Sequence, residues 1–269
     1  MKGFLKTSLQ TVLGKGGYRT ARSAYYAFRR WLKTRHRRAM DRLYWLRKYG
    51  LRHYSIYGHR LVPSGFPEDH AVALYDVAKS LPDISPVLVE IGSWLGKSSV
   101  VLSRAIKNKK GAVLFCIDPF NADGDPSSAA HYHDVSQKTD VPLLEQFIHN
   151  IKRYGSYKHV RALRGYSTDF SSDWNRPIDL LFIDGNHSYE SVRRDFLEWS
   201  PFIKPGGYLV MHDASFDPNF RHQDPIRVAR EFVLNNSEWV DHKQIRHMLI
   251  VRKAQDRSET SPVHETARL

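Results

Sequence analysis

The chain is poor in cysteine and has no long apolar run. Its 269 residues include a single cysteine, Cys116. One thiol excludes an intrachain disulfide framework and a cysteine metal cluster, and it fits a reducing cytosolic compartment. No apolar run reaches the roughly 18–20 residues of a membrane-spanning helix. The sequence therefore predicts a cytoplasmic protein, with enough ordinary apolar content for one α/β domain and its appendages.

Acidic residues are almost absent from the first 50 positions. Residues 1–50 contain 14 Lys and Arg but one acid, Asp41, whereas the formal charges of residues 51–269 cancel. Apolar side chains recur there at steps of three and four residues: Tyr18, Ala21, Tyr25, Phe28 and Leu32. The pattern predicts a basic extension over residues 1–50 made of one or two amphipathic helices. Residues 51–66, rich in Tyr, His, Gly and Pro, are interpreted as a linker.

A basic amphipathic extension can have several partners. It can lie on an anionic membrane surface, pack on a partner protein, bind nucleic acid, or pack on its own domain. We expect peripheral membrane or protein contact. We do not expect nucleic acid, because the rest of the chain is neutral. The sequence is also compatible with a homo-oligomer.

A buried strand, a glycine turn and a helix start follow one another from Val87 to Ser99. Gly92 and Gly96 allow close backbone approach, and a helix N-terminus after them favours an anion. Only three residues separate Gly92 from Gly96-Lys97-Ser98, whereas a P-loop needs four. We therefore favour a loop for a nucleoside cofactor over an ATP or GTP site or a ligand-free turn.

A second buried strand ends in a carboxylate. Residues 112–117 are mostly apolar, and Asp118 follows them, 26 positions after Gly92. An acid at the tip of the second strand of a doubly wound sheet is placed to accept hydrogen bonds from ribose hydroxyls.

Residues 121–140 form a polar segment with several potential metal ligands: Asp123, Asp125, His131, His133 and Asp134. A metal cluster and a mobile flap over the active site are the two functional interpretations. We favour the flap, because loops rarely preorganise metal ligands.

Two more predicted strands end in chemically active residues. The strand 179–183 is followed by Asp184 and His187, and the strand 208–211 by His212 and Asp213. Adjacent parallel strands place such residues on one rim of the sheet, although helix capping or a turn would also explain each one alone. The remaining predicted elements are helices near 67–80, 141–154, 189–202 and 226–234, a strand over 159–163, a reversal at Lys204-Pro-Gly-Gly207, an antiparallel pair over 239–242 and 244–251, and a disordered tail over 254–269.

These motifs in this order resemble class I S-adenosylmethionine-dependent methyltransferases. The closest likeness is to the small-molecule group with the Asp-Gly-x-His-Ser-Tyr signature, which is related to macrocin-type O-methyltransferases. The resemblance covers roughly residues 67–253. It implies an α/β fold, Rossmann-like and doubly wound, with a seven-stranded sheet of order 3-2-1-4-5-7-6 whose strand 7 is antiparallel.

The resemblance also implies a cofactor site for S-adenosylmethionine. Gly92, Gly96 and Glu90 would shape the loop, Ser98 would meet the methionine end, and Asp118 would hold the ribose. Tyr166 would flank the adenine. The residues implied for cofactor binding are Glu90, Gly92, Trp94, Gly96, Ser98, Asp118, Tyr166 and Asp184.

The implied reaction is methyl transfer to a small-molecule or glycan-like acceptor, at oxygen. In related enzymes, carboxylates at the positions of Asp184 and Asp213 hold a divalent cation such as Mg²⁺. This chain departs from that pattern at Asn186 and His212, where the relatives carry acids. A metal-free base, His187 or His212 acting with Asp184, is therefore an equal alternative. A non-catalytic scaffold protein of the same fold, acting through the basic extension, is the runner-up.

Overall fold

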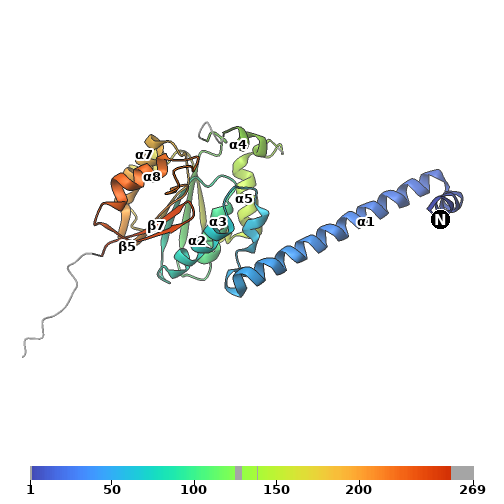
Figure 1. The fold of residues 1–269 in the computed structure, drawn as a ribbon, viewed down its shortest axis with the longest axis horizontal. Helices are drawn as coiled ribbons and strands as arrows, with labels where there is room; N and C mark the ends of the chain where they lie inside the picture. Colours follow the sequence, from blue (N-terminus) through green and yellow to red (C-terminus); the bar gives the residue numbers. More distant parts are fainter. Residues whose placement is uncertain (1, 125–128, 138, 256–269) are drawn as a thin grey trace, which may run out of the picture. The chain divides into compact units, whose positions relative to one another are not determined.

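The computed structural model of the protein describes residues 2–124, 129–137 and 139–255. The chain divides into two units, Met1–Tyr54 and Ser55–Leu269. The first unit consists of one helix, α1, Lys2–Tyr54, which continues four residues beyond the predicted extension (Figure 1). Among the described residues, no helix has both the length and the apolar character needed to span a membrane.

The segment 51–66, interpreted above as a linker, is folded in the structure. Its first four residues complete α1, and a short 3₁₀ helix follows at Tyr57–Leu61. Five of its side chains are buried: Ile56, Tyr57, His59, Val62 and Phe66. The Nζ of Lys97 also donates to the carbonyl of Ser64 at 2.9 Å. The second unit therefore begins near Ser55, because aromatic and aliphatic side chains before residue 67 contribute to its core.

A seven-stranded sheet forms the centre of the second unit. Its strands are β1 Val87–Ile91, β2 Val113–Asp118, β3 Val160–Arg164, β4 Ile178–Ile183, β5 Ile203–Met211, β6 Trp239–Ile245 and β7 Met248–Lys253. Their order is β3-β2-β1-β4-β5-β7-β6, and β7 pairs antiparallel with β5 and β6. The predicted fold class, strand order and antiparallel strand 7 are confirmed.

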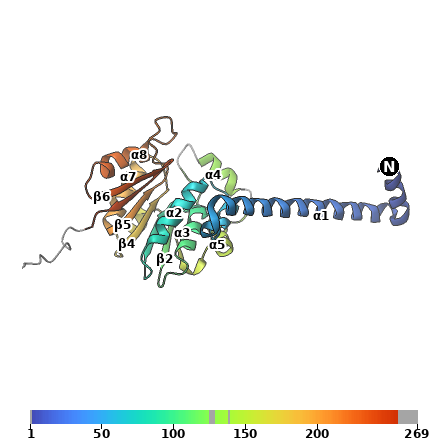
Figure 2. The ribbon, with the colours of Figure 1, turned by 60° about the horizontal axis from the view of Figure 1, so that its bottom comes forward.

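Helices cover both faces of the sheet. Their bounds are α2 Glu68–Ser80, α3 Lys97–Ala105, α4 Ala129–Ser136, α5 Leu143–Tyr154, α6 Thr168–Ser171, α7 Tyr189–Trp199 and α8 Asp224–Ala229. α2, α3 and α5 lie on one face, and α7 and α8 lie on the other (Figures 1 and 2). The apolar stripe predicted for the first of these helices is buried: Ala71, Leu74, Tyr75 and Ala78.

The central strands are buried along their whole length, which explains why their sequences are nearly continuous runs of apolar residues. Every residue of β1 and β4 is buried. The one acid inside β4, Asp179, is neutralised locally. It accepts a hydrogen bond from the backbone N–H of Val87 at 2.8 Å and pairs with the Nζ of Lys204 at 2.6 Å. Asp179 thus joins the amino ends of three strands.

Several element boundaries differ from the sequence prediction. The reversal predicted at residues 204–207 lies inside β5, where a register shift in the pairing with β4 absorbs Pro205 and both glycines. The predicted helix 226–234 becomes α8 followed by a π-helical turn, Arg230–Leu234. The turn between β6 and β7 lies at Arg246-His247 rather than before Gln244.

Two predictions fall partly on residues that the structure leaves out. The polar segment 121–140, predicted as a loop, contains the helix α4. Residues 125–128 and 138 of this segment lie outside the described residues. The tail predicted to be disordered over 254–269 also lies outside them from residue 256 onward.

Candidate functional site

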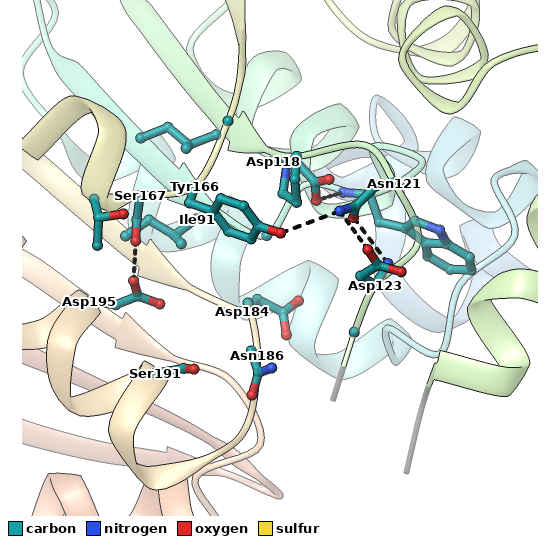
Figure 3. Close-up of a pocket in the computed structure, with 18 of the residues that line it drawn as sticks. Ile91, Asp118, Asn121, Asp123, Tyr166, Ser167, Asp184, Asn186, Ser191 and Asp195 are labelled. Carbon is teal, nitrogen blue, oxygen red and sulfur yellow. Dashed lines mark hydrogen bonds between the residues drawn. The ribbon is translucent and has the colours of Figure 1, made fainter. Parts of the chain in front are cut away.

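A cavity of about 420 Å³ opens at the carboxyl ends of β1, β2 and β4, beside the turn that follows β3. Its size is in the range of small-molecule sites. Figure 3 shows the side chains that line it. Five of the eight residues predicted to bind a cofactor line this cavity: Gly92, Trp94, Asp118, Tyr166 and Asp184.

Gly92 lies where the ends of β1 and β4 come together. Its φ is +87°, and a Cβ built on it would lie 2.2 Å from the carbonyl oxygen of Asp184. The backbone N–H of Asp184 donates to the carbonyl of Ile91 at 2.9 Å. The glycine is therefore required by the close approach of two strand ends, in addition to its place in the cavity wall.

The other predicted loop residues act behind the cavity wall. Glu90 is fully buried, and it accepts hydrogen bonds from the hydroxyls of Ser93 (2.9 Å) and Ser99. Burial raises the pKa of Glu90. Gly96 packs against α5, since a Cβ there would lie 2.9 Å from the ring of Phe147. Ser98 is buried at the start of α3 and does not line the cavity.

Asp118 presents its carboxylate at the tip of β2. One oxygen accepts the backbone N–H of Trp94 at 2.8 Å, and the other accepts that of Phe120 at 2.6 Å. Burial raises the pKa of Asp118, and these backbone hydrogen bonds oppose the rise. Each oxygen keeps a second lone pair, so the group can still accept hydrogen bonds from a vicinal diol.

Beside Asp118, the cavity wall contains a polar cluster of which only Tyr166 was predicted from the sequence (Figure 3). The side-chain amide of Asn121 donates to Asp123 at 2.9 Å and to the hydroxyl of Tyr166 at 3.4 Å (Figure 3). The ring of Tyr132, from α4, lies 4.7 Å from that of Trp94. These groups offer both aromatic faces and hydrogen-bonding atoms to a nucleoside-sized ligand.

Ser167 and Asp195 form a further pair in the cavity that sequence reasoning missed. The hydroxyl of Ser167 donates to the carboxylate of Asp195, and both side chains are buried (Figure 3). Burial raises the pKa of Asp195 to about 6. A signal was present in the sequence. Asp195 is an acid three residues after Val192 and just before Phe196, on the inward face of α7.

A second group of side chains gathers where β4 and β5 end. Asp184, His187, His212 and Asp213 each offer a ligand atom, and these atoms all lie within 4.8 Å of one another. The Nδ1 of His212 lies 2.9 Å from a carboxylate oxygen of Asp184, and the Nε2 of His187 lies 3.1 Å from one of Asp213. The predicted convergence of these four residues on one rim is found in the structure.

The carboxylates of this group control its protonation. Burial lowers the pKa of His212, but the charges and hydrogen bonds of Asp184 and Asp213 outweigh it and raise the value to about 10. Burial likewise opposes ionisation of Asp213, yet hydrogen bonds from His187 and His212 bring its pKa below the usual range. His212 is therefore an imidazolium at neutral pH in the metal-free protein.

Two more histidines join this rim from elements far away in the sequence. The Nδ1 of His70, on α2, lies 3.0 Å from the Nε2 of His212. The Nε2 of His247, in the β6–β7 turn, lies 3.5 Å from a carboxylate oxygen of Asp213. Neither residue was identified from the sequence, because nothing local shows that α2 and this turn approach the end of β5.

The metal cluster considered for the polar segment 121–140 is not found among the described residues. Two of the predicted ligands, His133 and Asp123, do lie near each other, but both side chains are exposed, and the Nε2 of His133 is 3.7 Å from Oδ1 of Asp123. Asp125 and the side chain of His131 lie outside the description.

Comparison with known proteins identifies the domain. Residues 89–214 match the family model described as a methyltransferase domain. A protein of Acanthamoeba polyphaga mimivirus, R132, is 29% identical over 144 residues, which are 54% of this chain and 58% of that protein. The chain thus aligns with little more than half the length of this relative.

Solved structures show the same fold at low identity. The O-methyltransferase TomG of Streptomyces achromogenes, solved with S-adenosylmethionine, has a TM-score of 0.52 and 16% identity, covering 75% of this chain and 88% of TomG. An O-methyltransferase from Bacillus cereus in complex with S-adenosylhomocysteine has a TM-score of 0.52 and 14% identity, covering 80% of this chain and 97% of that one. The sheet order and these likenesses show that the α/β unit has the fold of class I S-adenosylmethionine-dependent methyltransferases, and residues 89–214 resemble a methyltransferase domain.

Proposed function

We propose that this protein transfers the methyl group of S-adenosylmethionine to an oxygen of a small-molecule or glycan-like acceptor. The observation that supports this best is one cavity of about 420 Å³ that joins Asp118, at the tip of β2, to Asp184, at the tip of β4. The first carboxylate suits a ribose, and the second lies beside the histidine-rich rim.

The residues that line the cavity fit the cofactor. Asp118 accepts hydrogen bonds from the ribose hydroxyls, and Tyr166 and Asn121 flank the base. Trp94 closes the cavity from the loop after β1. The bound cofactor supplies an electrophilic methyl group on a sulfonium, and the protein has to position the acceptor in line with it.

Removal of the acceptor proton is assigned to the rim. His187 is paired with Asp213, which orients its ring, as a carboxylate does for a general-base histidine. His212 is less suited to this role than the sequence suggested, because its raised pKa keeps it protonated. It instead provides a fixed positive charge beside Asp184, the residue proposed to orient the acceptor hydroxyl.

A divalent cation bound by Asp184 and Asp213 is the alternative to a histidine base for activating the acceptor hydroxyl. Their carboxylates belong to one group of potential metal ligands. A cation held there would lower the pKa of the acceptor hydroxyl. Asn186 and His212 reduce the negative charge of the site relative to a carboxylate-rich magnesium site, so we expect it to bind Mg²⁺ more weakly than such a site.

The decisive experiment is calorimetric titration of the full chain with S-adenosylmethionine. We expect saturable binding to the wild type, a large loss in Asp118→Ala, and no binding of ATP. Asp173→Ala, which removes an exposed acid after α6, is the matched control and should bind like the wild type. Binding that is equal in both variants, or a preference for ATP, would overturn the assignment of the cavity.

A non-catalytic scaffold is the second candidate, and Asn186 in place of an acid favours it. Such a protein would bind the cofactor but would show no turnover with a broad panel of hydroxylated acceptors, with or without Mg²⁺. Turnover of any acceptor that depends on His187 would exclude this candidate.

The basic helix α1 is proposed to contact an anionic membrane surface or a partner protein. Arg and Lys alternate there with exposed aromatic side chains, including Tyr25, Phe28 and Trp31. Adjacent Tyr25 and Tyr26 are both about half exposed, so the apolar residues do not form one narrow stripe. Peripheral contact driven largely by charge fits this surface better than deep burial of one apolar face.

A further inference from the structure

Three imidazoles from three separate elements meet beside the end of β5. His70 comes from α2, His212 follows β5, and His247 lies in the β6–β7 turn. Each offers one nitrogen, and the three nitrogens lie within 4.8 Å of one another. His70 is fully buried, and His212 is nearly so. We refer to these three residues as the histidine triad.

The spacing of the triad is that of atoms sharing one ion. Metal–nitrogen bonds of about 2.0–2.1 Å in a tetrahedral site separate the ligand atoms by roughly 3.3 Å. The Nδ1 of His70 and the Nε2 of His212 are 3.0 Å apart. His247 completes the set, because its ligand nitrogen lies within 4.8 Å of both of these nitrogens.

A carboxylate already orients the central histidine. The Nδ1 of His212 lies 2.9 Å from Oδ1 of Asp184, and its other nitrogen faces His70. Metal-bound histidines usually give their second nitrogen to a carboxylate, which fixes the ring and strengthens the ligand. Asp184 therefore does not bind the ion itself. It orients the ring of His212 so that the Nε2 faces the other two histidines.

A purely structural role explains the triad poorly. The Nε2 of His70 is buried and has no hydrogen-bond partner among the described residues. Within that part of the chain, the ring of His70 is hydrogen-bonded only to another imidazole, that of His212. The backbone beside the triad is also strained. Asp213 has a φ of +53° and Arg246 a φ of +51°, and non-glycine residues in this region concentrate at functional sites.

We propose that His70, His212 and His247 bind one transition-metal ion of the Zn²⁺ class, with solvent at the fourth position. Three imidazole nitrogens select Zn²⁺, Co²⁺ or Ni²⁺ over Mg²⁺, which prefers oxygen ligands. The ion would displace the proton shared by His70 and His212. This site differs in its ligands and its metal from a magnesium site at Asp184 and Asp213, and it does not depend on methyl transfer.

The test is direct metal binding by the tag-free full chain after removal of metals with a chelator. Calorimetric titration with Zn²⁺ should show one equivalent bound, and Mg²⁺ at the same concentration should not compete. Co²⁺ should give the visible absorption of a four-coordinate site. His247→Ala should bind Zn²⁺ at least about tenfold more weakly. His242→Ala, which removes an exposed histidine from the same hairpin, should bind like the wild type.

Other results would overturn the proposal. These are a failure of the wild type to bind Zn²⁺, equal binding by His247→Ala and the wild type, or effective competition by Mg²⁺. Loss of binding in Asp184→Asn with full binding in His247→Ala would place the ion at the carboxylates instead. Because His70 is fully buried, the proposal is tested through His247, whose side chain is partly exposed and lies in a turn. No cofactor or acceptor is present, so failure of the proposed methyl transfer would not affect this result.

Discussion

Gly92 offers the sharpest test at the scale of single residues. In Gly92→Ala the new Cβ would meet the backbone of Asp184, which cannot move without shifting β4, and the φ of +87° is unfavourable for alanine. We expect the free energy of unfolding to fall by about 2–5 kcal/mol, measured by urea denaturation. Gly65→Ala is the control, because a Cβ there meets nothing within 4 Å. Similar stabilities for the two variants would contradict the close approach.

Asp195 makes stability depend on pH. Its pKa is raised from 3.8 to about 6 in the folded protein, mainly by burial. Between these values the folded state binds more protons than the unfolded state, so this residue reduces stability as pH rises from about 4 to 6. The full cost, about 3 kcal/mol, applies above pH 6 and is absent below pH 4.

The matching measurement compares Asp195→Asn with the wild type by denaturant unfolding at several pH values. The variant keeps the acceptor for the hydroxyl of Ser167 but cannot ionise. The difference in stability between the two proteins should grow in favour of the variant from pH 4 to pH 6 and then stay constant. The exposed Asp173→Asn should follow the wild type at every pH. A difference that does not change with pH would remove Asp195 as the cause.

Individual residues show where sequence reasoning works and where it stops. Asp118 and Asp184 could be found because an acid directly after an apolar strand must lie at the carboxyl edge of a parallel sheet. Glu90 and Gly96 stand in the same motif, yet they hold the loop and pack on α5, a distinction that requires the neighbouring helix. His70 and His247 approach the site only through tertiary structure, so no local pattern could have revealed them.

At the scale of elements, α1 is distinguished by its charge. Arg35, Arg37 and Arg38 are all exposed on this helix. We expect the triple change of these residues to Gln to weaken binding of the full chain to anionic vesicles, measured by sedimentation. The free energy of binding should fall by a few kilocalories per mole at most, at about 1 kcal/mol for each cation near the surface. Neutral vesicles should bind both proteins weakly. Equal sedimentation of both proteins with anionic vesicles would reject the membrane interpretation and leave a protein partner.

The elements that sequence reasoning misjudged share a physical cause. Residues 51–66 have the composition of a linker, but Ile56, Val62 and Phe66 bury their side chains in the domain. Pro205 and the two glycines after it look like a reversal, but a register shift lets β5 continue through them. In both cases tertiary packing overrides local preference, whereas the amphipathic stripe of α2 agrees with its packing and could be predicted.

At the scale of the whole molecule, the order of the sheet could be predicted because its elements are all consistent with one topology. Buried apolar strands alternate with helices, and the tips of β2, β4 and β5 carry residues that suit a ligand. The position of the cavity follows from this order. The side chains that line it do not, because Ser167, just before α6, and Asp195, in α7, are brought together only in the folded structure.

One residue, Asp184, links the cavity to the histidine triad, which predicts coupling between their ligands. Asp184 lines the cavity and also pairs with His212. A dication in place of the proton on His212 adds positive charge beside Asp184, and this charge repels the sulfonium of S-adenosylmethionine more than the neutral sulfur of S-adenosylhomocysteine. We therefore expect Zn²⁺ to raise the dissociation constant of S-adenosylmethionine relative to that of S-adenosylhomocysteine, on the order of fivefold.

The coupling can be measured in both directions. By linkage, the factor by which Zn²⁺ weakens binding of S-adenosylmethionine must equal the factor by which the cofactor weakens binding of Zn²⁺. In His247→Ala, at Zn²⁺ concentrations that saturate the wild type, the ratio should stay at its metal-free value. His242→Ala should show the full change. If Zn²⁺ binds through the triad but leaves the ratio unchanged, Asp184 does not connect the two sites electrostatically, and metal and cofactor act on this domain independently.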